Sequence, residues 1–290
     1  MLAAILENMP SDQLVIHDDV TLRDLAPGEV QIKVSHSGVC HSDLSVMNGT
    51  IPQQVPCVLG HEGAGVVTDV GDGVTHVAPG DHVIIAFSPP CGTCPFCTGR
   101  NQPNLCMTGM IAMATSQQFR RGDTVVGSMS GCGTFAEETI VPGFAAIKID
   151  QDVPLDVAAL IGCGVTTGVG AAMNTAKVSP GSSVCIIGAG GVGVAAIQGA
   201  RIAGAAEIVA IDLHEGKLER AKAFGATHGA VPEDVPAVMA EVTGGEGFDY
   251  TLECIGMPTT MRQAFDLTRR GGTCCIVGVG RAEETFELSA

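Results

Sequence analysis

The sequence contains a compact cysteine cluster whose spacing suits a metal ion. Three thiols follow one another at C-x2-C-x2-C spacing and a fourth lies nearby: Cys91, Cys94, Cys97 and Cys106. Prolines and glycines around the cluster predict a bent loop that points several thiolates inward. Four thiolates form the closed, tetrahedral site of a structural zinc ion. An iron–sulfur cluster or unrelated buried cysteines are the alternatives, and zinc is favoured because four thiols fall within so short a segment.

A glycine-rich motif predicts a dinucleotide site. It follows the strand-like run 184–187, opens an Ala-rich helical segment, and comprises Gly188, Gly190, Gly191, Val192 and Gly193. Glycines at G-x-G-x-x-G spacing let a pyrophosphate approach the backbone N–H groups at a helix start. Asp212 lies 19 residues beyond Gly193, close to the ~20 expected for the carboxylate on a ribose 2′-hydroxyl. Because a carboxylate repels a 2′-phosphate, NAD is favoured over NADP. The alternative is a glycine turn that binds nothing.

Three further metal-ligand types are dispersed along the chain. Cys40 precedes a group of polar residues, His61 stands beside Glu62, and Cys163 lies between two glycines. Taken singly, each has an ordinary explanation as a buried thiol or a core histidine. Composition alone cannot bring them together in space. Two cysteines and one histidine would form a catalytic type of zinc site, with its fourth position open.

Composition and charge narrow the class of protein. The chain has 290 residues, 46% of them apolar, and 39 glycines, which is enough for two domains with real cores and unlike a disordered chain. A formal charge of −16 argues against a nucleic acid or an anionic membrane as partner. The N-terminus shows no secretory signal, which predicts a cytoplasmic location. Twelve cysteines in that compartment indicate metal or thiol chemistry ahead of disulfides.

The elements that must position these residues change type near residue 150. Before it, short Val/Ile-rich runs predict strands of an irregular β-barrel at 30–34, 65–70 and 82–85. After it, strand-like runs at 184–187, 208–211, 251–253 and 273–277 alternate with helical segments at 191–203 and 215–224. That βαβ rhythm predicts a parallel sheet. Two long uncharged stretches, 157–176 and 178–200, resemble membrane spans in length, but a buried strand, a glycine turn and a close-packed helix explain the second better.

All three constellations, in this order, resemble those of the zinc-containing medium-chain alcohol dehydrogenases, over essentially the whole chain. The resemblance implies an α/β protein with a β-rich part. A GroES-like, irregular β-barrel catalytic domain would cover residues 1–164, with a structural zinc lobe at about 88–107. A Rossmann NAD-binding domain, lacking its last strand, would cover 165–290. It also implies oxidation of an alcohol to an aldehyde or ketone, and the reverse, with hydride transfer to NAD and two zinc ions per chain.

The resemblance further implies roles for individual residues. The catalytic zinc ligands match Cys40, His61 and Cys163, and the structural ones match Cys91, Cys94, Cys97 and Cys106. Ser42 matches the hydroxyl that starts the proton relay, Asp43 the carboxylate that orients the ligand histidine, and Glu62 a glutamate near the metal. His41 falls where a basic residue contacts the pyrophosphate, Thr167 near the nicotinamide, Lys217 on the ribose, and Phe87 in the substrate pocket.

The chain departs from the family pattern in three places. Eight residues separate Cys97 from Cys106 where seven are usual, so we expect the loop to bulge by one. Ser45 stands where the relay often ends at a histidine. The sequence ends at Ala290, where family members continue into a sixth strand used for dimer pairing. We therefore expect a truncated chain with a five-stranded sheet and one unprotected edge, and a homodimer or homotetramer for the full-length protein.

Other functions stay open at this point. The sequence around Cys163 also resembles that of glutathione-linked formaldehyde dehydrogenases, which favours a thiol-adduct substrate (glutathione or mycothiol). It is similar as well to family members that pass electrons to an external acceptor. An inactive fragment that binds zinc and NAD is a further alternative. The substrate depends on loops between 107 and 131, where Met107, Met110 and Met113 are expected to fill core.

Overall fold

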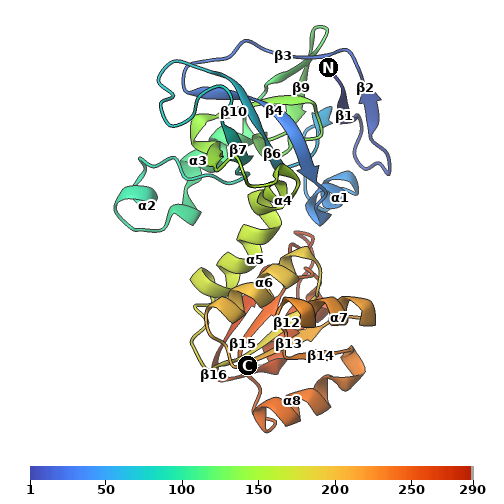
Figure 1. The fold of residues 1–290 in the computed structure, drawn as a ribbon. Helices are drawn as coiled ribbons and strands as arrows, with labels where there is room; N and C mark the ends of the chain where they lie inside the picture. The colour runs from blue at the N-terminus through green and yellow to red at the C-terminus, as the bar shows by residue number, and fades with distance from the viewer. Residues whose placement is uncertain (289–290) are drawn as a thin grey trace. The chain divides into compact units, whose positions relative to one another are not determined.

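The computed structural model describes residues 1–288 and divides into two compact units. The first covers Met1–Cys163 and the second begins at Gly164. In Figure 1 the first unit runs from blue to yellow-green and the second from yellow to red. Each unit has its own sheets and its own apolar core, so each is described by itself.

The first unit is built from two sheets of short strands. One has six strands in the order β2 (Val15–His17), β1 (Ala3–Leu6), β5 (Cys57–Val58), β9 (Thr124–Ser128), β8 (Phe119–Arg121) and β3 (Val20–Leu22). The other has five, all antiparallel: β10 (Glu138–Pro142), β4 (Glu29–Gly38), β6 (Glu62–Val70), β7 (His82–Ile85) and β11 (Ala146–Ile149). The three strand runs predicted from the sequence fall within β4, β6 and β7, and the expected β-rich first part is confirmed.

Short helices connect these strands, and three of them begin directly after the predicted ligands Cys40, Cys94 and Cys106. They are α1 (His41–Met47), α2 (Pro95–Thr98), α3 (Met107–Ala114) and α4 (Leu155–Leu160), with single 3₁₀ turns at Pro103–Leu105, Met129–Gly131 and Gly143–Ala145. Only Val39 and Cys40 separate the end of β4 from the start of α1, and β6 begins directly after His61. Because β4 and β6 are antiparallel neighbours with Gly38 opposite Glu62, the start of α1 and the start of β6 lie side by side.

The second unit is a five-stranded parallel sheet with helices between its strands. The strand order is β14 (His228–Ala230), β13 (Glu207–Ile211), β12 (Ser183–Ile187), β15 (Phe248–Glu253) and β16 (Thr268–Ile276). The remaining elements are α5 (Thr166–Gly170), α6 (Gly191–Ile202), α7 (Glu215–Phe224), the 3₁₀ turn Pro232–Asp234, α8 (Val235–Thr243) and α9 (Pro258–Leu267). The expected parallel sheet is confirmed.

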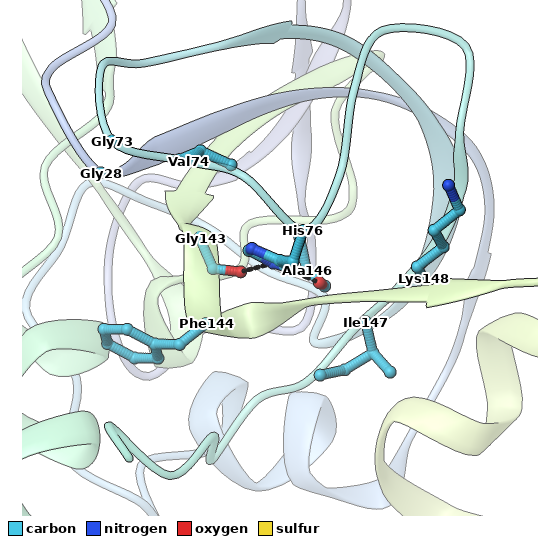
Figure 2. Close-up of a pocket in the computed structure, with 9 residues that line it drawn as sticks. All are labelled: Gly28, Gly73, Val74, His76, Gly143, Phe144, Ala146, Ile147 and Lys148. Atoms are coloured by element: carbon cyan, nitrogen blue, oxygen red, sulfur yellow. Dashed lines mark hydrogen bonds between the residues drawn. The ribbon is translucent and has the colours of Figure 1, made fainter. Parts of the chain in front are cut away.

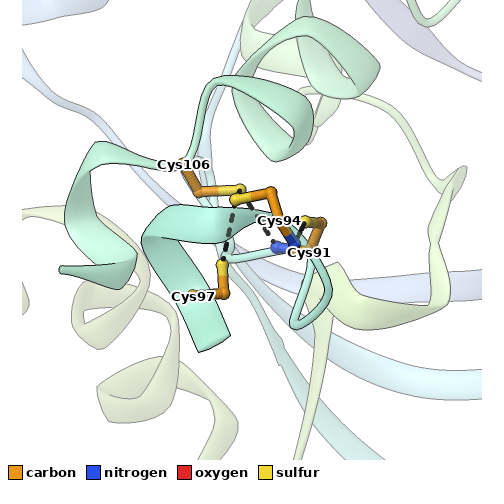
Figure 3. Close-up of side chains that lie close together, drawn as sticks. All are labelled: Cys91, Cys94, Cys97 and Cys106. Carbon is orange, nitrogen blue, oxygen red and sulfur yellow. Dashed lines mark hydrogen bonds between the residues drawn. The ribbon is translucent and has the colours of Figure 1, made fainter. Parts of the chain in front are cut away.

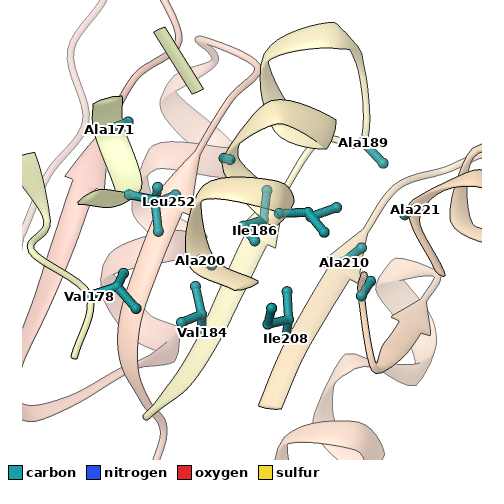
Figure 4. Close-up of a cluster of buried hydrophobic side chains, with 14 of the residues drawn as sticks. Ala171, Val178, Val184, Ile186, Ala189, Ala200, Ile208, Ala210, Ala221 and Leu252 are labelled. Carbon is teal, nitrogen blue, oxygen red and sulfur yellow. The ribbon is translucent and has the colours of Figure 1, made fainter. Parts of the chain in front are cut away.

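The period of two along β12 explains how this sheet is buried on both faces. Val184 and Ile186 point into one apolar cluster with Ala196 and Ala200 of α6 (Figure 4). Cys185 and Ile187 point into the cluster on the opposite face, with α8 and α9 residues. Small alanines on α6 let that helix lie close to the strands. Because β12 and the inward face of α6 are both buried, the segment 178–200 has the long uncharged sequence that resembles a membrane span.

One helical run, Leu155–Thr175, is long and apolar enough to cross a membrane by length and composition. It comprises α4, a π-helical segment Ile161–Val165, α5 and a second π-helical segment Ala171–Thr175. A single run of this kind is weak evidence for a membrane span, because core helices pass the same test. The π-helical segment contains Cys163, and such segments occur frequently at functional sites.

Candidate zinc sites and dinucleotide site

The four cysteines of the predicted lobe converge on one point (Figure 3). Their sulfur atoms all lie within 4.8 Å of one another. The Cys94 sulfur is 3.6 Å from that of Cys97 and 3.7 Å from that of Cys106. Backbone N–H groups of Cys91 and Gly109 both donate to the Cys106 sulfur at 3.2 Å, which favours a thiolate there. The eight-residue interval before Cys106 includes Asn101 at φ +50°, so the longer loop still returns its last thiol to the cluster.

The donor chemistry of this cluster fits a zinc ion. A hydrogen bond with the Thr93 hydroxyl lowers the pKa of Cys91 to about 5, whereas loss of solvation raises the pKa of Cys97 to about 12. Several thiolates this close together repel one another, and a divalent cation is what lets all four sulfurs ionise. Four protein ligands leave no position for a substrate, so the lobe suits a structural ion.

The second cluster brings together residues that are far apart in the sequence. Ligand atoms of Cys40, His61, Glu62 and Cys163 lie within 4.8 Å of one another. Cys40 caps the N-terminus of α1, His61 and Glu62 lie at the start of β6, and Cys163 lies in the π-helical segment. His61 and Glu62 are 2% and 5% exposed. Buried polar groups of this kind need partners, and two sulfurs with one imidazole form the donor set of a catalytic zinc site.

Asp43 joins the two segments that supply Cys40 and His61. Its Oδ2 accepts a hydrogen bond from the Cys40 N–H at 2.9 Å, and its Oδ1 accepts one from the Gly60 N–H at 3.0 Å. The same Oδ1 lies 3.4 Å from Nδ1 of His61, too poorly aligned for a full hydrogen bond. The carboxylate is 3% exposed. It therefore faces Nδ1 of the ring and leaves Nε2 as the ligand nitrogen.

In the metal-free cluster, the Cys40 thiolate lies beside a protonated His61 ring. A hydrogen bond from the Cys163 thiol, supported by His61 and Ser42, lowers the pKa of Cys40 to about 3. Burial by itself lowers the pKa of His61, but the Asp43 carboxylate and the Cys40 thiolate outweigh it and raise the pKa to about 9. A metal ion would replace the proton on His61.

Two of the residues predicted around this cluster, Ser42 and Phe87, lie close to its ligands. The Ser42 hydroxyl is 3.6 Å from the Cys40 sulfur. The Phe87 ring meets the His61 ring edge-on with centroids 5.8 Å apart. His41, the first residue of α1, is exposed, and Ser45, which replaces the usual histidine, is 5% exposed. Ser45 therefore lies inside the fold.

The methionine prediction was wrong in part. Met113 is 1% exposed and fills core, but Met107 and Met110 on α3 are 52% and 47% exposed. Gly109 and Met113 occupy the inward face of the eight-residue helix, so the other methionines point outward. Each step of three residues falls about 60° short of a full helical turn, so Met113 lies about 120° around the helix from Met107.

The glycine turn of the second unit has the geometry of a dinucleotide cradle. Gly188 has φ +94°, and a Cβ on Gly193 would overlap the carbonyl oxygen of Gly188. These two glycines are needed for the turn itself. By contrast, a Cβ on Gly190 or Gly191 would meet no atom within 4 Å. That open space lies at the N-terminus of α6, where a pyrophosphate can contact backbone N–H groups.

Asp212 fastens the glycine turn to the end of β13. Its Oδ2 accepts from the Ala189 N–H at 3.0 Å and its Oδ1 from the His214 N–H at 3.0 Å, and the Lys217 ammonium lies 3.4 Å from Oδ2. Burial raises the pKa of Asp212, but these bonds outweigh it and hold the pKa below its usual value. The carboxylate thus stays ionised beside the cradle, as a ribose-binding group requires.

Thr167 and Val192 lie where two helices of this unit meet. Thr167 is on α5 next to Gly168, and a Cβ on Gly168 would overlap the carbonyl oxygen of Val192 at the start of α6. The close packing of α5 on α6 therefore places Thr167 near the glycine turn.

Sequence reasoning did not identify Thr134, which supports the turn before His61. Its N–H donates to the Gly60 carbonyl at 3.0 Å, and its hydroxyl lies 2.7 Å from that of Ser37 on β4. Thr134 is 2% exposed. No motif marks it, because its role depends on contacts between residues nearly a hundred positions apart.

A surface pocket of about 490 Å³ on the first unit contains none of the predicted site residues (Figure 2). His76 in its wall directs Nε2 at the carbonyl oxygens of Gly143 and Ala146, at 3.0 and 3.3 Å. Lys148 at its rim pairs with Asp81 at 2.7 Å. The polar groups of this pocket are engaged in holding its own loops, so we assign it no part in the chemistry.

Comparison with known proteins identifies the class to which this fold and these sites belong. Residues 26–151 match the alcohol dehydrogenase GroES-like domain, and residues 191–290 match the zinc-binding dehydrogenase domain. An S-(hydroxymethyl)glutathione dehydrogenase from Photobacterium damsela subsp. piscicida is 46% identical over 275 residues, covering 89% of this chain and 74% of the relative.

Two solved structures are similar over nearly the whole chain. An alcohol dehydrogenase zinc-binding domain protein from Burkholderia ambifaria has a TM-score of 0.91 at 34% identity, covering 99% of this chain and 79% of that one. The benzyl alcohol dehydrogenase from Acinetobacter calcoaceticus has a TM-score of 0.88 at 32% identity, covering 100% and 80%. This chain belongs to the zinc-dependent medium-chain alcohol dehydrogenases. Members of this family are oxidoreductases that use zinc and a nicotinamide dinucleotide and act on small alcohols or aldehydes.

Proposed function

We propose that this chain oxidises a small alcohol at the cluster of Cys40, His61 and Cys163, with NAD as the hydride acceptor. The observation that supports the proposal is the convergence of these three residues from distant segments, with ligand atoms within 4.8 Å. Two sulfurs and one nitrogen leave a coordination position for a substrate, unlike the four sulfurs of the lobe. Zinc held there supplies a Lewis acid that makes the alcohol easier to deprotonate.

The residues around the ligands perform the remaining steps. Ser42 accepts the proton of the alcohol and passes it to water, since Ser45 offers no imidazole to continue a relay. Asp43 fixes the tautomer and orientation of His61. Glu62 contributes a carboxylate oxygen among the ligand atoms and would lie close to a zinc ion held there. Phe87, edge-on to His61, forms an apolar wall for the carbon that loses its hydride.

The sites in each unit suggest a separate role for each domain. We assign residues 1–164 to a catalytic domain whose structural zinc lobe covers about 88–107, and residues 165–290 to the NAD-binding domain. His41 would contact the pyrophosphate, Thr167 the nicotinamide, and Asp212 with Lys217 the adenosine ribose. The ionised Asp212 carboxylate opposes a 2′-phosphate, which supports NAD over NADP.

The cellular location and the oligomeric state of the protein belong to the same proposal. We infer a cytoplasmic enzyme that forms a homodimer or homotetramer. Among residues 1–288, β16 is an edge strand of the parallel sheet, and its Ile276 is 40% exposed. An exposed edge of this kind favours pairing with a second copy. Light scattering on the purified protein would test the assembly.

The first test of the proposed function is NADH formation by the purified chain with zinc, NAD⁺ and a panel of primary and secondary alcohols. We expect turnover, and none in Cys40→Ala. Substantial activity in Cys40→Ala would refute the metal assignment. Binding of NADH without any turnover, in folded and zinc-loaded protein, would instead favour an inactive dinucleotide-binding fragment or an electron acceptor other than free NAD⁺.

A second candidate function is a dehydrogenase of thiol adducts of formaldehyde. It is favoured by the relative from Photobacterium damsela subsp. piscicida, whose name describes S-(hydroxymethyl)glutathione as its substrate. Formaldehyde supplied with and without glutathione or mycothiol separates the two. Activity that requires the thiol would establish the adduct as substrate, whereas equal turnover of plain alcohols would remove this candidate.

A further inference from the structure

Glu253 is a fully buried acid that none of the predicted sites includes. It is 0% exposed and is the last residue of β15. In the sheet it stands opposite Ile187 of β12 and Ile276 of β16. The strand order runs outward from β12 in one direction through β13 and in the other through β15. In a parallel sheet, ligands bind at the carboxyl ends of the strands where the order reverses, and Glu253 lies at that point.

One oxygen of Glu253 organises the turn that follows β15. Its Oε1 accepts three hydrogen bonds, from the N–H of Ile255 at 2.9 Å, the N–H of Gly256 at 2.8 Å and the Thr260 hydroxyl at 2.7 Å. Its Oε2 is buried without a hydrogen-bond partner among the described residues. A buried acid is costly to keep. Three donors on one oxygen indicate that it is kept to hold this turn in one shape.

The turn held by Glu253 lies directly against the glycine turn. A Cβ on Gly188 would lie 2.6 Å from Cγ1 of Ile255, and the Cys254 N–H donates to the Ile187 carbonyl at 2.9 Å. On its other side, a Cβ on Gly256 would lie 2.5 Å from the carbonyl oxygen of Val279. The turn is therefore wedged between the dinucleotide cradle and the chain that leaves β16.

We propose that Glu253 is a positioning residue for dinucleotide binding: it fixes the Cys254–Gly256 turn, and through Ile255 it fixes the position of Gly188 in the cradle. This inference rests on the proposed NAD site. Glu253 does not touch the cofactor, because its carboxylate is wholly enclosed. It acts by keeping the backbone at Gly188 in the shape that receives a pyrophosphate, and so lowers the entropy that binding would otherwise lose.

The experiment measures NADH affinity by fluorescence, together with the melting temperature, in four variants of the chain. Glu253→Gln keeps an oxygen that can accept from the three donors, so its dissociation constant should stay within about threefold of wild type. Glu253→Asp, one methylene shorter, cannot reach all three donors, and its dissociation constant should rise about tenfold or more. Thr260→Val removes one of the three donors, so its dissociation constant should lie between those of Glu253→Gln and Glu253→Asp.

Thr251→Val is the matched control. Thr251 lies two residues earlier on the same strand, is also 0% exposed, and donates its hydroxyl to the Ala264 carbonyl at 2.9 Å, away from the turn. We expect it to lower the melting temperature with NADH affinity unchanged. The alcohol KM of Glu253→Asp should also stay unchanged while its KM for NAD⁺ rises.

The outcomes separate this inference from the proposed function. If wild type binds NADH and Glu253→Asp binds it equally well, Glu253 does not position the cradle, although the NAD site stands. If Thr251→Val weakens NADH binding as much as Glu253→Asp, the effect is general destabilisation and the inference fails. If wild type does not bind NADH, both the site and the inference are wrong.

Discussion

Asp43 contacts both of the segments that supply Cys40 and His61. It receives N–H groups from Cys40 and Gly60 and faces the ring of His61. Asp43→Asn would place an amide N–H₂ against one of two N–H donors and leave that donor unpaired in a buried place. We expect zinc affinity at this cluster to fall about 10- to 100-fold, with zinc in the cysteine lobe retained. Metal analysis after dialysis against a chelator measures this.

Asp81→Asn is the control for that substitution. Asp81 also caps a loop of the first unit, accepting from the Ala78 N–H at 2.9 Å and pairing with Lys148, but it lies outside both cysteine clusters. It should retain both zinc ions. Loss of zinc in both variants would mean that Asp43 acts through the stability of the unit and not through the ligands.

The protonation of His61 predicts how zinc uptake depends on pH. With its pKa raised to about 9, the ring is protonated in the metal-free protein at neutral pH. It stabilises that metal-free fold fully below about pH 6.5, and this stabilisation disappears as the pH rises through 9. Because zinc must displace this proton and the proton of the Cys163 thiol, affinity should increase by at least about tenfold per pH unit between 7 and 9. Calorimetry in buffers of different ionisation enthalpy should detect proton release, and a flat profile would contradict it.

At the scale of elements, the cysteine lobe depends on its ion, since α2 and the turn Pro103–Leu105 are too short to hold their shape alone. Arg100 lies inside the lobe and is the only Lys or Arg between Lys33 and Arg120. Cys106→Ser should therefore open the lobe and speed tryptic cleavage after Arg100 about tenfold or more. Cys274→Ser, which changes a cysteine of β16 outside both clusters, should leave the rate unchanged. Resistance of Cys106→Ser to trypsin would show that the lobe holds without a fourth thiolate.

Elements with a strong local pattern were predictable and those fixed by neighbours were not. Helix α7 was predicted with its observed bounds, Glu215–Phe224, because Gly225 at φ +119° ends it. Strand β16 begins at Thr268, five residues earlier than expected, since two glycines in its first half conceal the strand pattern. Strand β14, only three residues with a central glycine, was missed because its pairing with β13 defines it.

The candidate sites divide in the same way. The cysteine lobe and the glycine turn are local in sequence, so spacing alone predicted them. Convergence of Cys40, His61 and Cys163 depends on the pairing of β4 with β6 and on the placing of a helix a hundred residues later; only the family resemblance brought these three together in advance. Glu253 and Thr134 carry no sequence signal, because burial and hydrogen bonding distinguish them from other acids and threonines.

Charge is a property of the whole molecule that bears on its substrate. The formal charge is −16, and residues 1–163 contain six Lys or Arg against seventeen Asp or Glu. Between Lys33 and Arg100, a segment that includes Cys40 and His61, there is no Lys or Arg at all. Of the six cations, Arg23 is bound to Glu29, Arg121 to Glu7 and Lys148 to Asp81. Such a field raises the barrier to a negatively charged substrate.

We therefore expect a preference for uncharged alcohols, tested with benzyl alcohol and its para-carboxylate, which share the reacting group and differ by one charge. At low ionic strength kcat/KM for the carboxylate should be lower by about tenfold, and the difference should shrink as added salt shortens the Debye length to about 8 Å and below. Neutral benzyl alcohol should show little dependence on salt. A carboxylate turned over as well as the neutral alcohol, at any salt concentration, would contradict the argument from charge and would favour an acidic substrate such as a glutathione adduct.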